Sequence, residues 1–334
     1  MRKIVTCIHC LMFILSPYAL FGQNDYGFRH LQTIYKGDTV DILVKSKKGE
    51  EQKKKPLFFF CQGSQPIPLI ITYDQNGRQG IYSVFPFNPD SLSNEYHLAI
   101  ISKPYVPLIV NQKSLSDDLT YKDNTGQYPR KYIERNLLDY YVKRDKSVIR
   151  FLRKQNWISK DKLVIAGHSE GSAIAAKLAL TSNSVTALIY SGASPMGRIM
   201  TIIERSRAKE TDSTREAEAD INYWEKIVAD PGNMDGGDRD AYGTTYQFSI
   251  PLIRYVEKLK IPVLVTYGSK DASAPFNDYL RVETIRQKKK NFTFKAYIGT
   301  EHNFFPLKPD GTVNYDIFNW DKVAGDWRTW LTGK

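Results

Sequence analysis

The chain contains little cysteine. Only three of its 334 residues are cysteine, and two of them, Cys7 and Cys10, lie in an apolar N-terminal segment. Without that segment Cys61 stands alone, and a protein with one cysteine forms no internal disulfide. Cys61 closes the apolar run 57–61, where we expect a buried small hydrophobe and not a nucleophile. A disulfide framework is therefore excluded, and stability must come from the core.

Metal-binding and phosphate-binding patterns are also missing from the sequence. Nothing has the cysteine and histidine spacing of a zinc site, and no glycine motif of the phosphate-binding type is present. Asp235, Asp238 and Asp240 suggest a calcium loop, but they lack the downstream bidentate glutamate of an EF-hand. We interpret this cluster as a solvated turn, and we predict neither a metal nor an organic cofactor.

Acidic residues are outnumbered by basic ones. The 47 Lys and Arg residues exceed the 36 Asp and Glu residues, which gives a net charge of +11. The excess lies in runs such as 53–55 and 288–290, a pattern typical of solvated loops and helix ends. A groove that binds nucleic acid has aromatic residues interleaved with its basic residues. No aromatic residues are interleaved with these basic runs. We predict no nucleic-acid partner.

The N-terminal segment has the pattern of a secretory signal. Arg2 and Lys3 precede an apolar run at 4–15, and the small residue Gly22 lies just before Gln23. The run is too short to span a bilayer comfortably. We predict a signal peptide at 1–22 and a mature domain at 23–334, which implies a secreted or periplasmic protein without stable membrane insertion after cleavage. An uncleaved N-terminal anchor is the alternative.

Apolar strands alternate with amphipathic helices along the chain. With 42% hydrophobic residues there is ample material for a core. Strands are expected at 38–46, 56–61, 97–103, 163–166, 187–190, 262–267 and 292–298, and helices at 132–155, 172–180, 278–288 and 320–331. This alternation predicts an α/β fold with a doubly wound, mostly parallel sheet.

One region interrupts the alternation. Residues 195–260 separate two predicted strands by far more than an ordinary crossover. Within the region, 198–220 is charged and predicted to be helical. We interpret 195–260 as a helical cap over the active site, with a second small domain as the alternative.

The segment Gly167-His168-Ser169-Glu170-Gly171 fits the pattern G-x-S-x-G. The bare pattern is expected by chance in about one chain in ten of this length. Here a short strand precedes it and a helix follows it, so that Ser169 lies at the tip of a sharp turn. This context makes Ser169 a candidate nucleophile.

A serine nucleophile needs a general base, which an acid holds in place. Beyond the signal segment the histidines are His30, His97, His168 and His302. His168 adjoins Ser169, so its side chain must point away from the direction of the nucleophile. His302 lies in the loop after the strand 292–298, from which it can reach a serine at the end of an earlier strand. We therefore predict His302 as the base.

The acid follows from the same reasoning. Asp271 lies in the turn that follows the strand 262–267. Glu301 is a weaker candidate, because neighbours on one loop rarely face each other properly. The order along the chain is then Ser169, Asp271, His302.

On these residues the chain resembles a known superfamily. With GHSEG at 167–171, YGSKDASAP at 267–275 and GTEHNF at 299–304, residues 56–332 resemble an α/β-hydrolase-fold serine hydrolase. Within the superfamily the chain is similar to secreted bacterial esterase-like members related to the dienelactone-hydrolase and prolyl-oligopeptidase catalytic domains. The resemblance implies that Ser169 attacks the substrate carbonyl, His302 transfers the proton and Asp271 orients the imidazole.

An oxyanion hole requires two backbone N–H donors. One would be the N–H of Glu170, the residue after the nucleophile. The other is expected in the loop after the strand 56–61, where the family usually has His-Gly and this chain has Gln62-Gly63. We predict Ser64 as this donor and leave Gln65 open as the alternative.

These observations predict a secreted or periplasmic serine hydrolase that cleaves a carboxylic ester through an acyl-enzyme on Ser169. A small-molecule ester or acyl compound would be its partner, and the oligomeric state stays open. The alternatives are a serine peptidase of the prolyl-oligopeptidase type, a thioesterase, or a catalytically silent binding protein of the same fold.

Overall fold

The computed structural model describes residues 25–75, 78–235 and 240–333. The predicted signal peptide at 1–22 lies outside these ranges. Among the described residues, no helix has both the length and the apolar character needed to cross a membrane.

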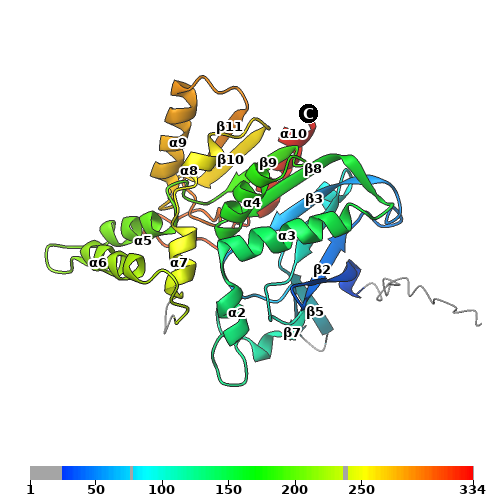
Figure 1. The fold of residues 1–334 in the computed structure, drawn as a ribbon, viewed down its shortest axis with the longest axis horizontal. Coiled ribbons are helices and arrows are strands. Elements are labelled where there is room, and N and C mark those ends of the chain that lie inside the picture. Colours follow the sequence, from blue (N-terminus) through cyan, green and yellow to red (C-terminus); the bar gives the residue numbers. More distant parts are fainter. Residues whose placement is uncertain (1–24, 76–77, 236–239, 334) are drawn as a thin grey trace, which may run out of the picture.

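An eight-stranded sheet forms the centre of the fold, in the order β1-β2-β6-β3-β8-β9-β10-β11 (Figure 1). The strands are β1 (Arg29–Tyr35), β2 (Asp38–Lys45), β3 (Lys55–Cys61), β6 (His97–Ile101), β8 (Ile158–His168), β9 (Ala187–Ser191), β10 (Val263–Gly268) and β11 (Phe292–Tyr297). β1, β2 and β6 pair antiparallel, and the six strands from β6 to β11 pair parallel. The predicted α/β fold with a mostly parallel sheet is confirmed.

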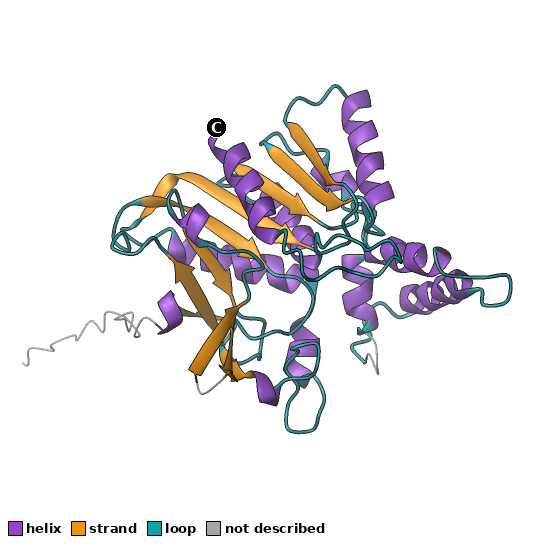
Figure 2. Ribbon diagram, turned by 180° about the vertical axis from the view of Figure 1, so that it is seen from behind, coloured by secondary structure: helices purple, strands orange, loops and turns teal. Residues whose placement is uncertain are grey.

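Helices lie on both faces of this sheet. The helices of the described chain are α1 (Asp90–Ser93), α2 (Arg130–Arg135), α3 (Leu138–Leu152), α4 (Glu170–Thr181), α5 (Arg198–Arg207), α6 (Glu216–Ala229), α7 (Tyr242–Phe248), α8 (Ile253–Val256), α9 (Ala274–Arg286) and α10 (Trp320–Thr332), with short 3-10 helices at Asp25–Gly27 and Gln112–Ser114. On one face α3 and α4 pack together, and α4 lies on β8 and β9. On the opposite face α10 lies across the sheet (Figure 2).

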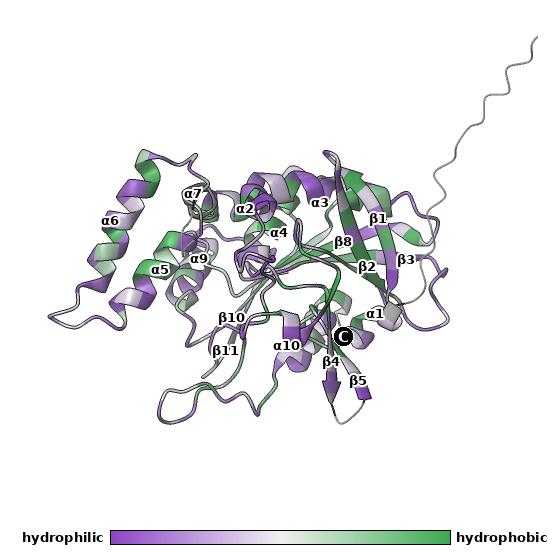
Figure 3. Ribbon diagram, turned by 90° about the horizontal axis from the view of Figure 1, so that it is seen from below, coloured by the Kyte–Doolittle hydropathy of each residue, from purple (hydrophilic) through white to green (hydrophobic). Residues whose placement is uncertain are grey.

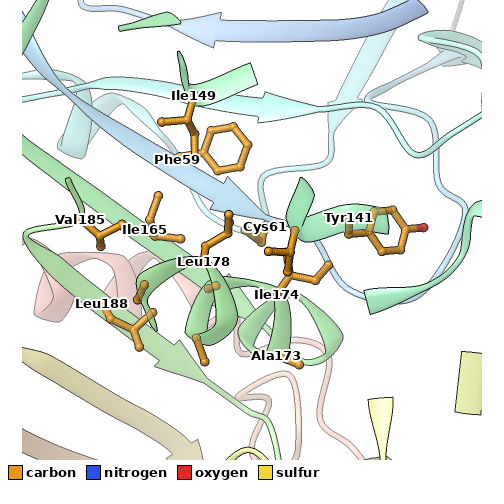
Figure 4. Close-up of a cluster of buried hydrophobic side chains, with 14 of the residues drawn as sticks. Phe59, Cys61, Tyr141, Ile149, Ile165, Ala173, Ile174, Leu178, Val185 and Leu188 are labelled. Carbon is orange, nitrogen blue, oxygen red and sulfur yellow. The ribbon is translucent and has the colours of Figure 1, made fainter. Parts of the chain in front are cut away.

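Alternate residues of the central strands supply the two halves of the core. Phe59 and Ile165 belong to the half under α4, where Ile174 and Leu178 pack against them (Figure 4). Phe58 and Phe60 belong to the other half, with Trp327 of α10. Because the central strands are covered on both faces, they are continuous apolar runs. Cys61 is buried in the first half, as expected.

The expected single helix at 132–155 is two helices, α2 and α3. Asn136 leaves the helical conformation, with φ −76° and ψ 60°. Its buried side-chain oxygen accepts a hydrogen bond of 3.1 Å from the Tyr141 hydroxyl. This bond between residues five positions apart stabilises a break that the apolar periodicity does not indicate.

A second, three-stranded sheet has the order β5-β4-β7. It comprises β4 (Ile70–Gln75), β5 (Arg78–Ser83) and β7 (Ile109–Asn111). The rings of Tyr73 and Tyr82 stack across it at 4.4 Å between centroids. Neither this sheet nor β1 was expected from the sequence; β7 has only three residues, and its pairing with β4 joins positions as far apart as Ile70 and Ile109.

The stretch between β9 and β10 contains helices α5 to α8. The expected helix at 198–220 is two helices, α5 and α6, which pack against each other and extend away from the main sheet (Figures 1 and 3). α8 packs against α4, so this stretch contacts the helix that follows Ser169.

Candidate active site

Ser169 occupies a strained turn between β8 and α4. Its backbone angles are φ 57° and ψ −128°, which a residue with a side chain rarely adopts. The turn is possible because its flanks are glycines. A Cβ at Gly167 would lie 2.2 Å from the carbonyl oxygen of Gly171, and a Cβ at Gly171 would lie 2.0 Å from that of Cys61. The backbone thus approaches too closely for any other residue at these two positions.

The three predicted residues Ser169, His302 and Asp271 lie together. Nε2 of His302 is 3.0 Å from Oγ of Ser169, and its Nδ1 is 2.8 Å from Oδ2 of Asp271. Each residue follows the carboxyl end of a parallel strand, since β8, β10 and β11 end at the same edge of the sheet. Residues 133 and 31 positions apart therefore form one continuous hydrogen-bonded chain.

Asp271 is held from two sides. Its side chain is 1% exposed, and the Ser273 hydroxyl donates to Oδ2 at 2.8 Å while the Ser273 N–H donates to Oδ1 at 3.1 Å. Burial by itself raises the pKa of Asp271, but the hydrogen bonds from His302 and Ser273 lower the pKa by more than burial raises it. The net pKa therefore lies below its usual value. The carboxylate is therefore ionised and accepts from Nδ1–H of the imidazole.

Glu301, the alternative acid, bonds to its own loop. Its Oε1 accepts from the backbone N–H groups of Asn303 and Phe305, at 2.8 and 3.0 Å. These bonds shape the loop that carries His302. The end of β10 lies in close contact with this loop. A Cβ at Gly268 would lie only 2.2 Å from the Glu301 carbonyl oxygen.

His168 lies behind His302 and is neutral. Its Nδ1 is 3.1 Å from the Ser191 hydroxyl, and its Nε2 is 3.2 Å from Oδ1 of Asn303. Burial, together with the positive charge that His302 can carry, lowers the pKa of His168 to about 3. Its ring packs edge-on against Trp320, with centroids 4.7 Å apart. The sequence indicated only that this ring points away from the nucleophile.

The two remaining histidines belong to other parts of the sheet. His30 in β1 bonds to Asp41 at 2.8 Å. His97 begins β6, at the opposite end of the parallel strands from Ser169, and its Nδ1 is 2.7 Å from the Ser46 hydroxyl. Both are accounted for by these structural bonds.

Both predicted oxyanion donors border the same cavity as Ser169. Glu170 and Ser64 line it, and the Tyr132 hydroxyl donates to the Ser64 carbonyl at 2.9 Å, which orients the loop. The side chain of Gln62 is buried and donates to the Ile101 carbonyl at 2.6 Å. Gln65, the alternative donor, is not among the residues that line this cavity, and its carbonyl accepts from the Ile67 N–H at 2.9 Å.

The cavity beside Ser169 has a volume of about 280 Å³. One face of α5 forms much of its wall through Arg198, Thr201, Ile202 and Arg205, which recur at helical spacing. The other lining residues are Ser64, Ser169, Glu170, Ala173, Gly192, Ala193, Ser194, Gly197, Asp240, Phe248, Leu252 and His302. The α5 wall was not predicted residue by residue, although the i, i+3, i+4, i+7 pattern was available in the sequence.

Two aspartates of the calcium-loop candidate are paired with arginines. Asp235 pairs with Arg130 at 2.7 Å, and Asp240 pairs with Arg198, whereas Asp238 lies outside the described residues. Within the described ranges, no three His, Cys, Asp or Glu side chains are grouped so that they could hold a metal ion.

The comparisons with known proteins agree with this architecture. Residues 237–326 match the model of the dienelactone hydrolase family, a segment that contains Asp271 and His302 and begins beyond Ser169. No curated protein sequence matches the chain.

Solved structures resemble most of the chain. Est1E from Butyrivibrio proteoclasticus, with ferulic acid bound, is 14% identical over 91% of this chain and 99% of that chain, with a TM-score of 0.53. A hypothetical protein from Pseudomonas aeruginosa is 12% identical over 98% and 99% of the two chains, with a TM-score of 0.53. A puromycin-hydrolyzing peptidase from Mycobacterium tuberculosis is 14% identical over 83% of this chain, with a TM-score of 0.50.

The chain spans 36% of that peptidase and 37% of an acylaminoacyl peptidase from Pyrococcus horikoshii that it also matches. At such identities a structural likeness establishes the fold. The protein therefore has the α/β-hydrolase fold, and its residues 237–326 match the dienelactone hydrolase family.

Proposed function

We propose that the protein is a serine hydrolase that cleaves a carboxylic ester through an acyl-enzyme on Ser169. One observation carries the proposal: the continuous chain from Ser169 through His302 to Asp271, with bonds of 3.0 and 2.8 Å, at the wall of a cavity. A serine hydroxyl becomes a nucleophile only when a base accepts its proton, and this geometry supplies that base.

The hydrogen bonds determine the direction of proton transfer. Because ionised Asp271 accepts from Nδ1–H, the Nε2 lone pair of His302 faces the Ser169 hydroxyl. Ser169 Oγ forms a bond to the ester carbonyl carbon while Nε2 takes its proton. The same proton then passes to the departing alkoxide, which leaves an acyl-enzyme and an alcohol. Water then attacks the acyl carbonyl carbon while Nε2 of His302 takes its proton. The proton passes to Oγ of Ser169 as the acyl–Oγ bond breaks, which releases the acid and restores Ser169.

The tetrahedral intermediate carries a negative oxygen that needs donors. We assign the N–H of Glu170, at the N-terminus of α4, and the N–H of Ser64 to this role. The α4 N-terminus adds the favourable end of its helix dipole. Loss of one oxyanion donor typically costs about 100- to 1000-fold in turnover.

An ester is the favoured substrate class. Est1E, which matches this chain over nearly its full length, has ferulic acid, a carboxylic acid, bound in its structure. The α5 wall places Thr201 and Ile202 between two arginines in the cavity, so an acyl group would meet both polar and apolar side chains. We infer that the region 195–260 acts as a cap, because α5 forms this wall. Secretion or export to the periplasm, as the segment 1–22 suggests, is part of the same proposal.

Covalent labelling tests the nucleophile. A fluorophosphonate probe is expected to add one phosphonyl group to the wild-type protein and none to Ser169→Ala. Ser194→Ala is the matched control, because Ser194 borders the same cavity and its hydroxyl accepts from the Met196 N–H at 3.1 Å. Absence of labelling in folded wild-type protein, or equal labelling in Ser169→Ala, would overturn the proposal.

A substrate panel tests the bond that is cleaved. We expect turnover of p-nitrophenyl esters to exceed that of acyl-CoA thioesters and aminoacyl anilides. A preference for anilides would support a peptidase, and a preference for acyl-CoA would support a thioesterase. N-terminal sequencing of the exported protein tests cleavage after Gly22.

A further inference from the structure

We propose that Glu170 is a positioning residue for this hydrolysis: its buried carboxylate, held between Lys103 and Arg198, joins the nucleophile turn to the first helix of the 195–260 region. The inference rests on the proposed function. It adds a second role to Glu170, whose backbone N–H alone was assigned above.

The Glu170 carboxylate lies in the interior with two cations. Its side chain and that of Lys103 are each 2% exposed, and Nζ of Lys103 is 3.0 Å from Oε1. The side chain of Arg198 is 16% exposed, and its guanidinium pairs with Oε2. A buried carboxylate is tolerated only when its oxygens are paired, and both oxygens of Glu170 are.

The charge of Glu170 is maintained by these partners. Burial by itself raises the pKa of this carboxyl group, but Lys103 and Arg198 outweigh burial, so that the net pKa is below its usual value. Glu170 is therefore an anion inside the protein, one residue from the nucleophile. Either cation alone would leave one carboxylate oxygen without its ionic partner.

The two cations come from separate parts of the fold. Lys103 follows β6, and its ammonium lies 4.5 Å from the centre of the Tyr141 ring. Arg198 is the first residue of α5 and lies over the Phe248 ring of α7 at 4.8 Å. Its second nitrogen pairs with Asp240, which precedes α7. The four residues Lys103, Glu170, Arg198 and Asp240 form one charged chain from the sheet to the helices beyond β9.

The start of α5 leaves Arg198 little freedom. Gly197 before it has φ 93°, and a Cβ there would lie 2.4 Å from the Ser249 carbonyl oxygen. The Ile199 N–H after it donates to the Ser249 hydroxyl at 3.0 Å. The Arg198–Glu170 pair therefore connects a fixed point of the helical region to the first residue of α4.

This connection affects both the oxyanion donor and the cavity wall. The backbone N–H of Glu170 takes its direction from the start of α4, which the side chain ties to Lys103 and Arg198. An unpaired carboxylate so close to a developing oxyanion would oppose it, and the two cations remove that opposition. The ion pair between Arg198 and Glu170 also fixes the position of the start of α5 relative to Ser169.

Kinetics of four variants test the proposal, with each rate divided by the number of active sites titrated with a fluorophosphonate. Glu170→Gln removes the charge and keeps the shape, and we expect kcat on a p-nitrophenyl ester to fall about 10- to 100-fold, less than for complete loss of an oxyanion donor. Arg198→Met is expected to lower kcat in the same range, and Arg198→Lys to recover part of it. The double variant E170Q/R198M should be no slower than the slower single variant, because the two residues act as one unit.

Arg207→Met is the matched control, since Arg207 lies on α5 with an exposed side chain paired to Glu210 and should leave kcat within twofold. The proposal is overturned if kcat per titrated site in Glu170→Gln stays within twofold of wild type, or if the single effects multiply in the double variant. If Glu170→Gln does not fold, Arg198→Met and Arg198→Lys decide alone by the same twofold limit. Failure of the wild type to label would instead refute the hydrolase itself.

Discussion

The imidazole rings of His168 and His302 lie 4.9 Å apart between centroids, and it is the more distant one in sequence that bonds to Ser169. His168 is next to Ser169 in the chain, but it stands behind His302 with Trp320 at its edge. A second positive charge at this distance from His302 would be unfavourable. The neutral ring of His168 therefore packs against His302, the proposed base, and does not compete with His302 for a proton.

The stability of the protein is expected to depend on pH through His168. Its pKa is about 3 in the folded state and about 6.5 when unfolded, so the unfolded chain binds more protons between these values. The contribution of neutral His168 to the free energy of unfolding is fully present above pH 6.5. It decreases by about 1.4 kcal/mol per pH unit as the pH falls from 6.5 toward 3. Unfolding in urea from pH 8 to pH 5 measures this change.

The comparison variant is His168→Gln, which has no titrating ring. The free-energy gap between wild type and variant should shrink by about 2 kcal/mol from pH 7.5 to pH 5. Other titrating groups, such as Asp145 with a pKa raised to about 7 by burial, are present in both proteins and cancel. Parallel pH profiles for the two proteins would show that His168 is not buried in its neutral form.

Removing a member of the Ser169–His302–Asp271 chain should abolish most turnover while leaving the fold intact. By comparison with serine hydrolases of known mechanism, Ser169→Ala or His302→Ala should lower kcat by about 10⁶-fold. The double variant should be no slower than either single one, because the two residues act together. His30→Gln in β1 is the control and should retain wild-type kcat. Near-normal kcat in His302→Ala would contradict the assignment of the base.

The choice between the two candidate acids can be tested by a matched pair of amide substitutions. Asp271→Asn disturbs the acceptor of Nδ1–H and should lower kcat by about 10⁴-fold. Glu301→Gln keeps an oxygen that can accept from the Asn303 and Phe305 N–H groups, and its kcat should fall by less than about tenfold. The reverse ranking would assign the acid to Glu301.

The turn at Ser169 should not tolerate a methyl group at either glycine. Gly171→Ala puts a Cβ 2.0 Å from the Cys61 carbonyl oxygen, and we expect a loss of about 3 kcal/mol or more of unfolding free energy. Gly325→Ala in α10 is the control, because nothing lies within 4 Å of its Cβ position, and it should gain about 0.5–1 kcal/mol. Thermal unfolding compares the three proteins. Equal midpoints for Gly171→Ala and wild type would contradict the close approach.

Much of the fold follows from local sequence signals. The runs around Phe59, Ile165 and Val265 are apolar and short, and each forms a strand of the parallel sheet. Since parallel strands end at one edge, residues just beyond them are near each other wherever they lie in the chain. From this rule the sequence predicts that Ser169, Asp271 and His302 lie near one another.

Other features depend on contacts that no local window contains. The β5-β4-β7 sheet depends on the pairing of β4 with β7, which joins Ile70 to Ile109 and Ile71 to Val110. Lys103, Glu170 and Arg198 are 67 and 28 residues apart, and nothing in their neighbourhoods indicates a partner. Each of these outcomes required the assembled core.

The sequence by itself determined the alternation of the central parallel strands with helices, the sharp turn at Ser169 and the places of the three residues that follow strand ends, because these depend on local periodicity and on glycine at two positions. The tertiary structure alone decided how these residues bond, with Nε2 of His302 at Ser169 and Nδ1 at Asp271, and that Glu170 pairs with Lys103 and Arg198. The physical reason is that a side chain's partner is set by burial and direction in space, which only the packed chain defines.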